Sequence, residues 1–248
     1  MVRIILRTQK VEPNVERKAL ALLSGGIDSP VALWSAMRGG WHVDAIHFHS
    51  YPFSCSNAIQ KAKELSGLLL PMQGGGTLYL APFLDIQETM LKNTNPRLRV
   101  VLYRRMMARI AQFIALREGA SLLITGDSLG QVSSQTLTNL ANVDAAVEMP
   151  LIRPLIGLDK SEIVRIARSI GTYPISIRPH EDCCTLFTTG RPSTTPPLTW
   201  IESEESKLDV DQLVLNSVEH IEKFYFQDSL EGLTHNEKST RLVSSSGI

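Results

Sequence analysis

Residues 24–30, which read Ser-Gly-Gly-Ile-Asp-Ser-Pro, have the composition of a phosphate-binding loop. An apolar run at 19–23 precedes them and predicts a strand buried on both faces, whereas residues 31–37 have a helical composition and stop at two glycines. The loop therefore connects a strand to the start of a helix, where free N–H groups and the helix dipole attract an anion. Its glycines allow a close backbone approach, and its serines supply hydroxyl donors.

Asp28 distinguishes this loop from other phosphate-binding motifs. The loop has neither the Gly-Lys-Ser/Thr of the Walker motif nor the G-x-G-x-x-G of dinucleotide-binding proteins. A carboxylate beside polyphosphate is repelled unless a cation lies between them, so Asp28 predicts Mg²⁺, held directly or through water. An ordinary structural turn is the alternative interpretation of the motif alone. The string resembles the PP-loop of ATP pyrophosphatases, which split ATP between its α and β phosphates and adenylate a substrate.

The composition of the chain excludes several classes of protein. Its 248 residues are 43% hydrophobic and 20% charged, which suits one large α/β domain with appendages. The formal net charge is zero, so nucleic-acid binding requires a local basic patch or a partner. No apolar stretch approaches the ~20 residues that span a bilayer, so no membrane association is expected. Three cysteines argue against a disulfide scaffold and indicate a reducing, cytoplasmic location.

Strands and helices are expected to alternate along the chain. Further strands are predicted at 42–50, 77–81 and 122–124, with helices at 57–68 and in a long zone that breaks near 93–96. This order predicts an α/β fold with a doubly wound parallel sheet and helices on both faces. Ligands of such sheets bind at the carboxyl ends of the strands, so the loop at 24–30 and the turn that starts at Gly126 should face one crevice. The Gly triplet at 74–76 is interpreted as a flexible link.

The remainder of the chain divides by composition. Residues 1–17 are interpreted as a lead-in segment, 18–200 as the main domain, 201–227 as a helical extension and 228–248 as a polar, disordered tail. Asp159 and Glu162 form a capping pattern that opens a helix ending at Ile170. An acidic amphipathic helix is expected at 209–226.

Six motifs together resemble the pyrophosphatase domain of the tRNA 4-thiouridine synthetase family, sulfurtransferases also linked to formation of the thiamine thiazole. In chain order they are SGGIDSP, HFHS, RRMM, TGDSLGQVSSQ, PLIRPL with its capped helix, and EDCCT. The resemblance runs from about residue 17 to about residue 226. It implies a PP-loop fold of the adenine nucleotide alpha hydrolase type. The chain is expected to lack the THUMP and ferredoxin-like region that docks tRNA in this family, and the rhodanese domain of some members.

The resemblance also implies which residues contact ATP. They are Leu22, Leu23, Ser24, Gly25, Gly26, Asp28, Ser29, His47, Phe48, Arg104, Gly126 and Gln135, with Asp28 also at Mg²⁺. Arg104 and Arg105 are adjacent on a predicted helix and point about 100° apart, so only one should face the crevice, and we expect Arg104. Whether the ring of His47 has a structural role, with only its backbone at the nucleotide, stays open.

The cysteines have different expected roles. Cys183 and Cys184 are adjacent and cannot form an ordinary disulfide with each other without strain. Cys184 aligns with the reactive cysteine of the family, so it is the expected sulfur carrier, with Cys183 as a second candidate. The alternative is that Cys183 and Cys184 are small buried residues with no role in sulfur transfer. Cys55 lies near a helix start and is expected to be a packing residue.

The resemblance implies an ATP-dependent tRNA sulfurtransferase that uses ATP and Mg²⁺. The O4 of a tRNA uridine would attack the α phosphorus, and sulfur delivered as a persulfide by a cysteine desulfurase would displace AMP. The tRNA would bind with help from a separate RNA-binding chain or a dimer partner. Two alternatives stay open. The acceptor is a small molecule or a sulfur-carrier protein, or the chain is a nucleotide-binding regulatory module without catalysis, although Asp28 and the cysteine pair argue against the module.

Overall fold

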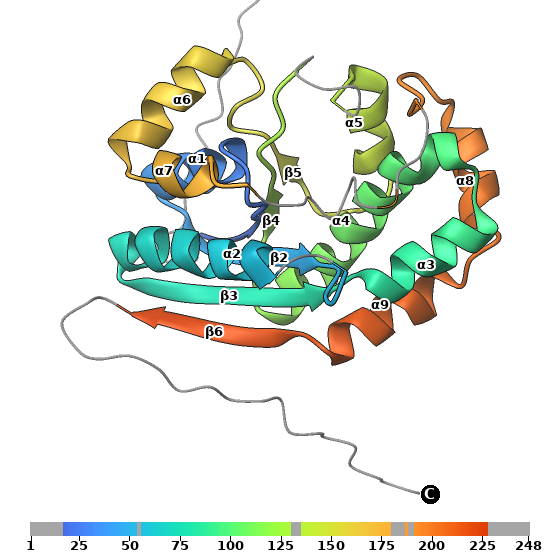
Figure 1. Cartoon of the computed structure of the whole chain (residues 1–248), viewed down its shortest axis with the longest axis horizontal. Helices are drawn as coiled ribbons and strands as arrows, with labels where there is room; N and C mark the ends of the chain where they lie inside the picture. The colour runs from blue at the N-terminus through green and yellow to red at the C-terminus, as the bar shows by residue number, and fades with distance from the viewer. Residues whose placement is uncertain (1–16, 54–55, 130–134, 180–186, 188–190, 228–248) are drawn as a thin grey trace, which may run out of the picture.

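The computed structural model describes residues 17–53, 56–129, 135–179, 187 and 191–227 (Figure 1). In this part of the chain, six strands form one sheet in the order β5-β4-β1-β2-β3-β6. Strands β1 to β5 pair in parallel, and β6 pairs antiparallel with β3 at one edge. The strands are β1 (Lys18–Leu22), β2 (His42–His49), β3 (Gly75–Pro82), β4 (Leu122–Ile124), β5 (Leu151–Ile152) and β6 (Glu222–Gln227). The α/β class and the parallel, doubly wound sheet are confirmed.

Both faces of the sheet are covered by helices, which bury alternate residues of each strand. On β1, Leu20 belongs to the core under one helical layer, and Ala19 and Ala21 belong to the core under the other. The first layer contains α3 (Leu84–Asn93), α4 (Arg99–Arg117), α5 (Leu137–Asp144), α8 (Leu198–Glu205) and α9 (Val210–Glu219). The second contains α1 (Asp28–Arg38), α2 (Ser56–Leu69), α6 (Lys160–Ser169) and α7 (Tyr173–Ser176). Figure 1 shows α1, α6 and α7 on one side and α4, α5 and α8 on the other.

Short 3₁₀ turns connect some of these elements. They are η1 (Leu70–Gln73), between α2 and β3, and η2 (Pro96–Leu98), between α3 and α4. The break expected near residues 93–96 is therefore present, because α3 ends at Asn93 and Pro96 opens η2.

The expected helix at 209–226 is wrong in its second half, because α9 ends at Glu219 and residues 222–227 form β6. Along β6 the side chains alternate: Phe224 and Phe226 pack on the core, and Tyr225 is 52% exposed. This period of two is the mark of a half-buried strand.

The interpretation of residues 74–76 as a flexible link is also wrong. Gly75 and Gly76 lie within β3, and a Cβ on Gly75 would come 2.8 Å from the carbonyl oxygen of Phe226. Gly75 has φ of 129°, which other residues rarely adopt. The glycine is therefore required for β6 to approach the edge of the sheet.

Two arginines of α4 are held by one acid from a distant part of the chain. Glu205 of α8 accepts bidentate hydrogen bonds from Arg105, at 2.8 and 2.8 Å, and from Arg109, at 2.6 and 2.9 Å. Arg105 is 2% exposed. Both arginines are therefore committed to an ion pair with Glu205.

Acid is expected to destabilise the protein through Glu205. Burial alone would raise the pKa of this carboxyl, but hydrogen bonds from Arg105 and Arg109 outweigh it and lower the pKa from 4.5 to about 2. A lowered pKa contributes stability above the unfolded value that is lost as the pH falls through the folded value. The free energy of unfolding should therefore decline between pH 4.5 and about 2. Urea titrations over this range should show a flatter decline for Glu205→Gln, but not for Glu202→Gln, an exposed acid on the same helix.

Candidate functional site

The loop at 24–29 is closed on itself by its two serines. The Ser24 N–H donates to Oγ of Ser29 at 2.8 Å, and the two hydroxyl oxygens lie 3.0 Å apart. Ser29 is 5% exposed. The hydroxyls expected as phosphate donors therefore brace the loop. Helix α1 starts at Asp28 without a side-chain cap, which leaves the N–H groups of its first turn for an anion.

Gly126, at the end of β4, lies against this loop. A Cβ at this position would come 2.6 Å from both N and Cα of Ser29 and 2.9 Å from the carbonyl carbon of Asp28. The two glycine-containing turns are thus in contact at the carboxyl ends of the neighbouring strands β1 and β4, as the topology predicts. The glycine was expected to admit the ligand. The structure shows that it is required first by the backbone of the loop.

Asp28 pairs with a lysine that the sequence analysis did not identify. Nζ of Lys160 lies 2.5 Å from Oδ1 of Asp28, and their side chains are 48% and 24% exposed. Lys160 is the first residue of α6, and the capping box between Asp159 and Glu162 fixes the start of that helix. The pattern around residue 159 predicted the helix start, but only the fold shows that this start faces the loop.

A second charged cluster lies around Asp127, directly after Gly126. Arg104 of α4 donates to both oxygens of this carboxylate at 2.6 Å, and Nε of Arg153 donates at 3.3 Å. Asp127 is 6% exposed. Burial raises the pKa of Asp127, but the charge of Arg104, a hydrogen bond from Thr125 and the charge of Arg153 outweigh it and hold the pKa below its usual value. The carboxylate is therefore ionised and fixes two arginines at the strand ends.

Gln135 joins the same cluster. Its Nε2 lies 3.5 Å from Oδ1 of Asp127, and its buried Oε1 has no hydrogen-bond partner among the residues that the structure describes. A buried amide oxygen without a partner is costly, so a ligand donor at this point would satisfy it. Asp127 and Arg153 were missed as site residues, although both lie within motifs that the sequence analysis quoted.

Strand β2 supplies the other residues expected at the nucleotide. Nδ1 of His47 donates to the carbonyl oxygen of Leu23 at 2.8 Å, and the imidazole is 5% exposed. The ring therefore fastens β2 to the start of the loop, which favours the structural alternative for this ring. Phe48 is 6% exposed and packs edge-on against Phe83, with ring centroids 5.6 Å apart. Leu22, the last residue of β1, is half-buried.

Arg104 and Arg105 point in different directions, as predicted. Arg104 reaches Asp127 at the strand ends, whereas Arg105 is buried against Glu205 and the carbonyl oxygen of Asn142. Arg104→Ala is therefore expected to weaken ATP binding about tenfold or more, and also to lower the stability, because the buried Asp127 carboxylate loses the nearer of its two arginine partners. Arg105→Ala is expected to lower the free energy of unfolding by roughly 2–4 kcal/mol, because it leaves the buried Glu205 carboxylate with one arginine, Arg109, in place of two. ATP titrations and urea unfolding of both variants check this, and equal losses of ATP affinity would refute the assignment.

Several predictions fall outside the described residues. They concern Cys55, Cys183, Cys184, the lead-in segment up to residue 16 and the tail at 228–248. Across the described ranges, no group of three His, Cys, Asp or Glu could hold a metal ion. None of the helices in these ranges combines the length and the apolar character needed to cross a membrane.

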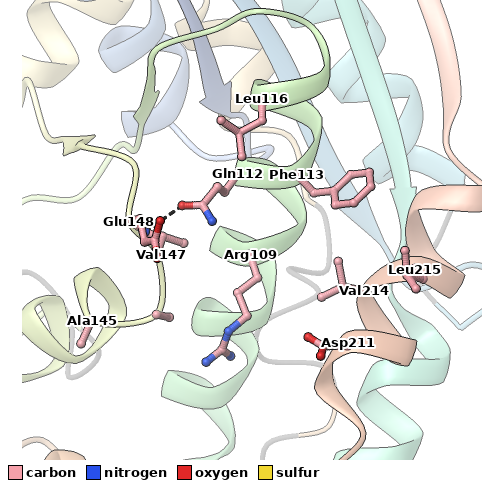
Figure 2. A pocket seen from close by; sticks show the side chains of 11 residues that line it. Arg109, Gln112, Phe113, Leu116, Ala145, Val147, Glu148, Asp211, Val214 and Leu215 are labelled. Atoms are coloured by element: carbon pink, nitrogen blue, oxygen red, sulfur yellow. Dashed lines mark hydrogen bonds between the residues drawn. The ribbon is translucent and has the colours of Figure 1, made fainter.

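A cavity of about 600 Å³ lies away from this site, between α4, α9 and the turn after α5 (Figure 2). Phe113, Leu116 and Leu215 line its apolar part. Figure 2 shows the side chain of Gln112 reaching the turn, where its Oε1 accepts the N–H of Glu148 at 2.8 Å. None of the residues expected at ATP lines this cavity. The cavity is therefore separate from the loop site.

Comparisons with known proteins show the family of the chain. The family model described as thiamine biosynthesis protein (ThiI) matches residues 14–210. Proteins named probable tRNA sulfurtransferase are 45% identical over 220 residues in Moorella thermoacetica and 48% identical over 202 residues in Thermus thermophilus. These matches cover 89% and 82% of this chain but 56% and 50% of the relatives. The chain thus spans about half the length of the curated relatives it matches.

Solved structures give the same result. The crystal structure of a 4-thiouridine synthetase–RNA complex with bound ATP superposes with a TM-score of 0.81 at 36% identity, over 85% of this chain and 55% of that one. NMN synthetase from Francisella tularensis has a TM-score of 0.53 at 16% identity, over 82% of this chain and 84% of that one, which shows a shared fold only. The chain therefore belongs to the ThiI family.

Proposed function

We propose that this chain carries the ATP-using step of a tRNA sulfurtransferase that makes 4-thiouridine. The observation that carries the proposal is the Asp28–Lys160 pair at the start of α1, beside the Arg104–Asp127 cluster on the neighbouring strand end. An adenylating enzyme needs a carboxylate for a metal ion and cations for the departing pyrophosphate, and this edge of the sheet supplies both. The relatives named tRNA sulfurtransferase, and the synthetase solved with RNA and ATP, support the substrate class.

The β and γ phosphates of ATP would lie against the loop at 24–29 and the first turn of α1. Lys160 and Arg104 would offset the charge that develops on the leaving pyrophosphate. Asp28 fits Mg²⁺, because this ion is commonly held by one or two carboxylates together with phosphates and water. Its second carboxylate oxygen has no partner among the described residues, so it can face a cation. Bound there, Mg²⁺ would neutralise the phosphates.

The reaction proposed for the base has two substitutions. The O4 of a tRNA uridine attacks the α phosphorus, the bond to the β-phosphate oxygen breaks, and pyrophosphate leaves. Persulfide sulfur from a cysteine desulfurase then attacks the activated ring carbon, and AMP leaves with the former O4. The sulfur is then bonded both to the base and, through an S–S bond, to the cysteine that carried it. A second thiolate attacks the carrier sulfur of this bond, which releases the thiolated base and leaves a disulfide that an added dithiol reduces. Cys184 would be either the carrier or the attacking thiolate, with Cys183 as the second candidate.

We assign this chemistry to residues 18–200. Residues 201–227 would then be an extension that braces the core, because α9 packs on α4 and β6 pairs with β3. Sulfur transfer toward the thiamine thiazole is a further route that the family description suggests. The protein would work in the cytoplasm, where the cysteines stay reduced.

The test supplies the purified protein with ATP, MgCl₂, sodium sulfide and unmodified tRNA. We expect AMP, pyrophosphate and tRNA 4-thiouridine to form in equal amounts, with the nucleoside measured by mass spectrometry. A cysteine desulfurase with cysteine then replaces sulfide and tests the donor. AMP formation with a small acceptor or a sulfur-carrier protein, but not with tRNA, would favour that alternative. ATP binding without AMP formation under all conditions would favour a regulatory module.

On its own, the chain is expected to bind tRNA weakly. Its net charge is zero, and Arg104, Arg105 and Arg109 are engaged by carboxylates, whereas stable complexes that neutralise about six phosphates depend on free cations. We therefore expect a dissociation constant above about 1 µM at physiological salt without an RNA-binding partner or dimer partner. Titration of labelled tRNA across a salt series measures it. Sub-micromolar affinity without a partner would contradict this charge argument.

A further inference from the structure

The turn after β2 presents two aromatic side chains to solvent at the edge of the sheet where the loop site lies. Tyr51 is 59% exposed and Phe53 is 58% exposed. Both follow β2, which ends at His49, so they lie at the carboxyl end of the sheet. Large aromatic side chains are usually buried, and two of them exposed on one turn beside a functional edge indicate a contact surface.

This turn follows β2, the strand that lies beside the start of the phosphate loop. The N–H of Leu23 donates to the carbonyl oxygen of Ile46 at 2.8 Å, and His47 reaches the Leu23 carbonyl from the same strand. The loop at 24–29 therefore leaves β1 beside β2, and the turn with Tyr51 and Phe53 follows the carboxyl end of β2.

The turn is held rigidly at its base. The N–H of Phe53 donates to the carbonyl oxygen of Ser50 at 2.8 Å, and the Ser50 hydroxyl, which is fully buried, donates to Gln87 of α3. The N–H of Phe83 donates to the carbonyl oxygen of His49 at 2.8 Å. A rigid base lowers the entropy that the rings lose when they bind a ligand.

Phe53 also contacts a ring from the region of the expected sulfur cysteines. Phe53 and Phe187 pack edge to face, with ring centroids 6.0 Å apart and an angle of 67° between the ring planes. Phe187 is three residues after Cys184 in the sequence. This ring contact therefore connects the turn at the carboxyl end of β2 to a residue that closely follows the cysteine pair in the sequence.

We propose that Tyr51, Phe53 and Phe187 form a stacking platform for an unpaired base of the RNA substrate. This rests on the proposed function, because thiolation of a uridine requires that its base leave the stack. Proteins hold such bases mainly by stacking them on aromatic rings, and each stacked base contributes about 1–3 kcal/mol. The exposed rings can stack on a base, and the anchored turn holds them at the same end of the sheet as the proposed site of adenylation.

Leucine variants test the stacking face, since leucine keeps the apolar contact but removes the ring. Phe53→Leu and Tyr51→Leu are each expected to weaken binding of a single-stranded uridine oligonucleotide about tenfold at low salt, with unchanged ATP affinity. Tyr225→Leu is the matched control. Tyr225 is 52% exposed on β6 and pairs with Thr77 near the amino end of β3. It therefore lies toward the end of the sheet opposite to the loop site. This variant should bind RNA as the parent does.

A tryptophan variant gives a direct signal. Phe53→Trp should keep RNA affinity, and its fluorescence should be quenched when the oligonucleotide binds but not when ATP binds. Quenching by ATP, a parallel loss of ATP affinity in Phe53→Leu, or parent-like RNA binding by both leucine variants would each overturn the platform. A parent that thiolates tRNA with the same KM for tRNA as Phe53→Leu keeps the proposed function and rejects the platform. If the leucine variants lose oligonucleotide binding but the parent does not thiolate tRNA, the platform is kept and the proposed function is rejected.

Discussion

Replacing Asp28 with alanine is expected to lower pyrophosphate release from ATP by roughly 10²–10³-fold or more while the fold stays intact. The carboxylate stands at the first residue of α1, where the phosphates would bind, and its described partner is Lys160 at 2.5 Å. Without it, nothing at this point holds a cation against the phosphates, and Lys160 loses the group that positions it. The side chain is 24% exposed, so its loss leaves no buried cavity.

The assay for this variant is release of pyrophosphate in single-turnover and steady-state experiments, with unfolding curves to show that the fold is kept. Asp85→Ala is a matched control, because Asp85 is an exposed acid in the first turn of α3 and its loss changes a helix dipole interaction in the same way. We expect the control to release pyrophosphate at the parent rate. A near-parent rate for Asp28→Ala would remove Asp28 from the proposed metal site.

The strands predicted best are those that contain a run of apolar residues alone, because such runs form strands that are buried on both faces. The apolar run around Leu20 and the run at Leu122–Ile124 are short, and both lie inside the parallel sheet where both faces are covered. Strand β6 was missed because it follows the amphipathic helix α9 closely. No glycine or proline between them marks the change from the helical period to the alternation of a strand. Its partner strand is about 150 residues earlier in the chain, and that pairing decides its conformation.

The site divides in the same way. Asp28 and Gly126 could be singled out because a local motif surrounds each of them. Lys160, by contrast, meets Asp28 from 132 residues away, and Glu205 meets Arg105 from 100 residues away. Such pairs depend on which helix starts and strand ends the topology brings together, and no local spacing encodes them. For that reason the sequence could single out the loop at 24–30 as a candidate phosphate site, but not the charged groups that the fold places beside it.

Gly126→Ala is expected to have the second large effect, through the backbone of the loop. A Cβ at residue 126 would lie 2.6 Å from N and Cα of Ser29, which is too close for any real contact, and both atoms belong to the main chain. The loop or the end of β4 must therefore shift by several tenths of an ångström or more. Overpacking of this kind costs about 1–3 kcal/mol of stability. A misplacement of ~1 Å in a positioned site costs about 10²-fold in rate.

Measuring both kcat/KM for ATP and the free energy of unfolding should separate the loss of activity from the loss of stability. We expect kcat/KM for ATP to fall about 10²-fold for Gly126→Ala, with the free energy of unfolding lower by about 1–3 kcal/mol. Gly157→Ala is the matched control, since Gly157 is exposed and a Cβ there meets nothing within 4 Å. It should match the parent in both measurements. If Gly126→Ala loses stability but keeps kcat/KM, the contact between β4 and the loop would be structural only, and the position of the loop would not depend on it.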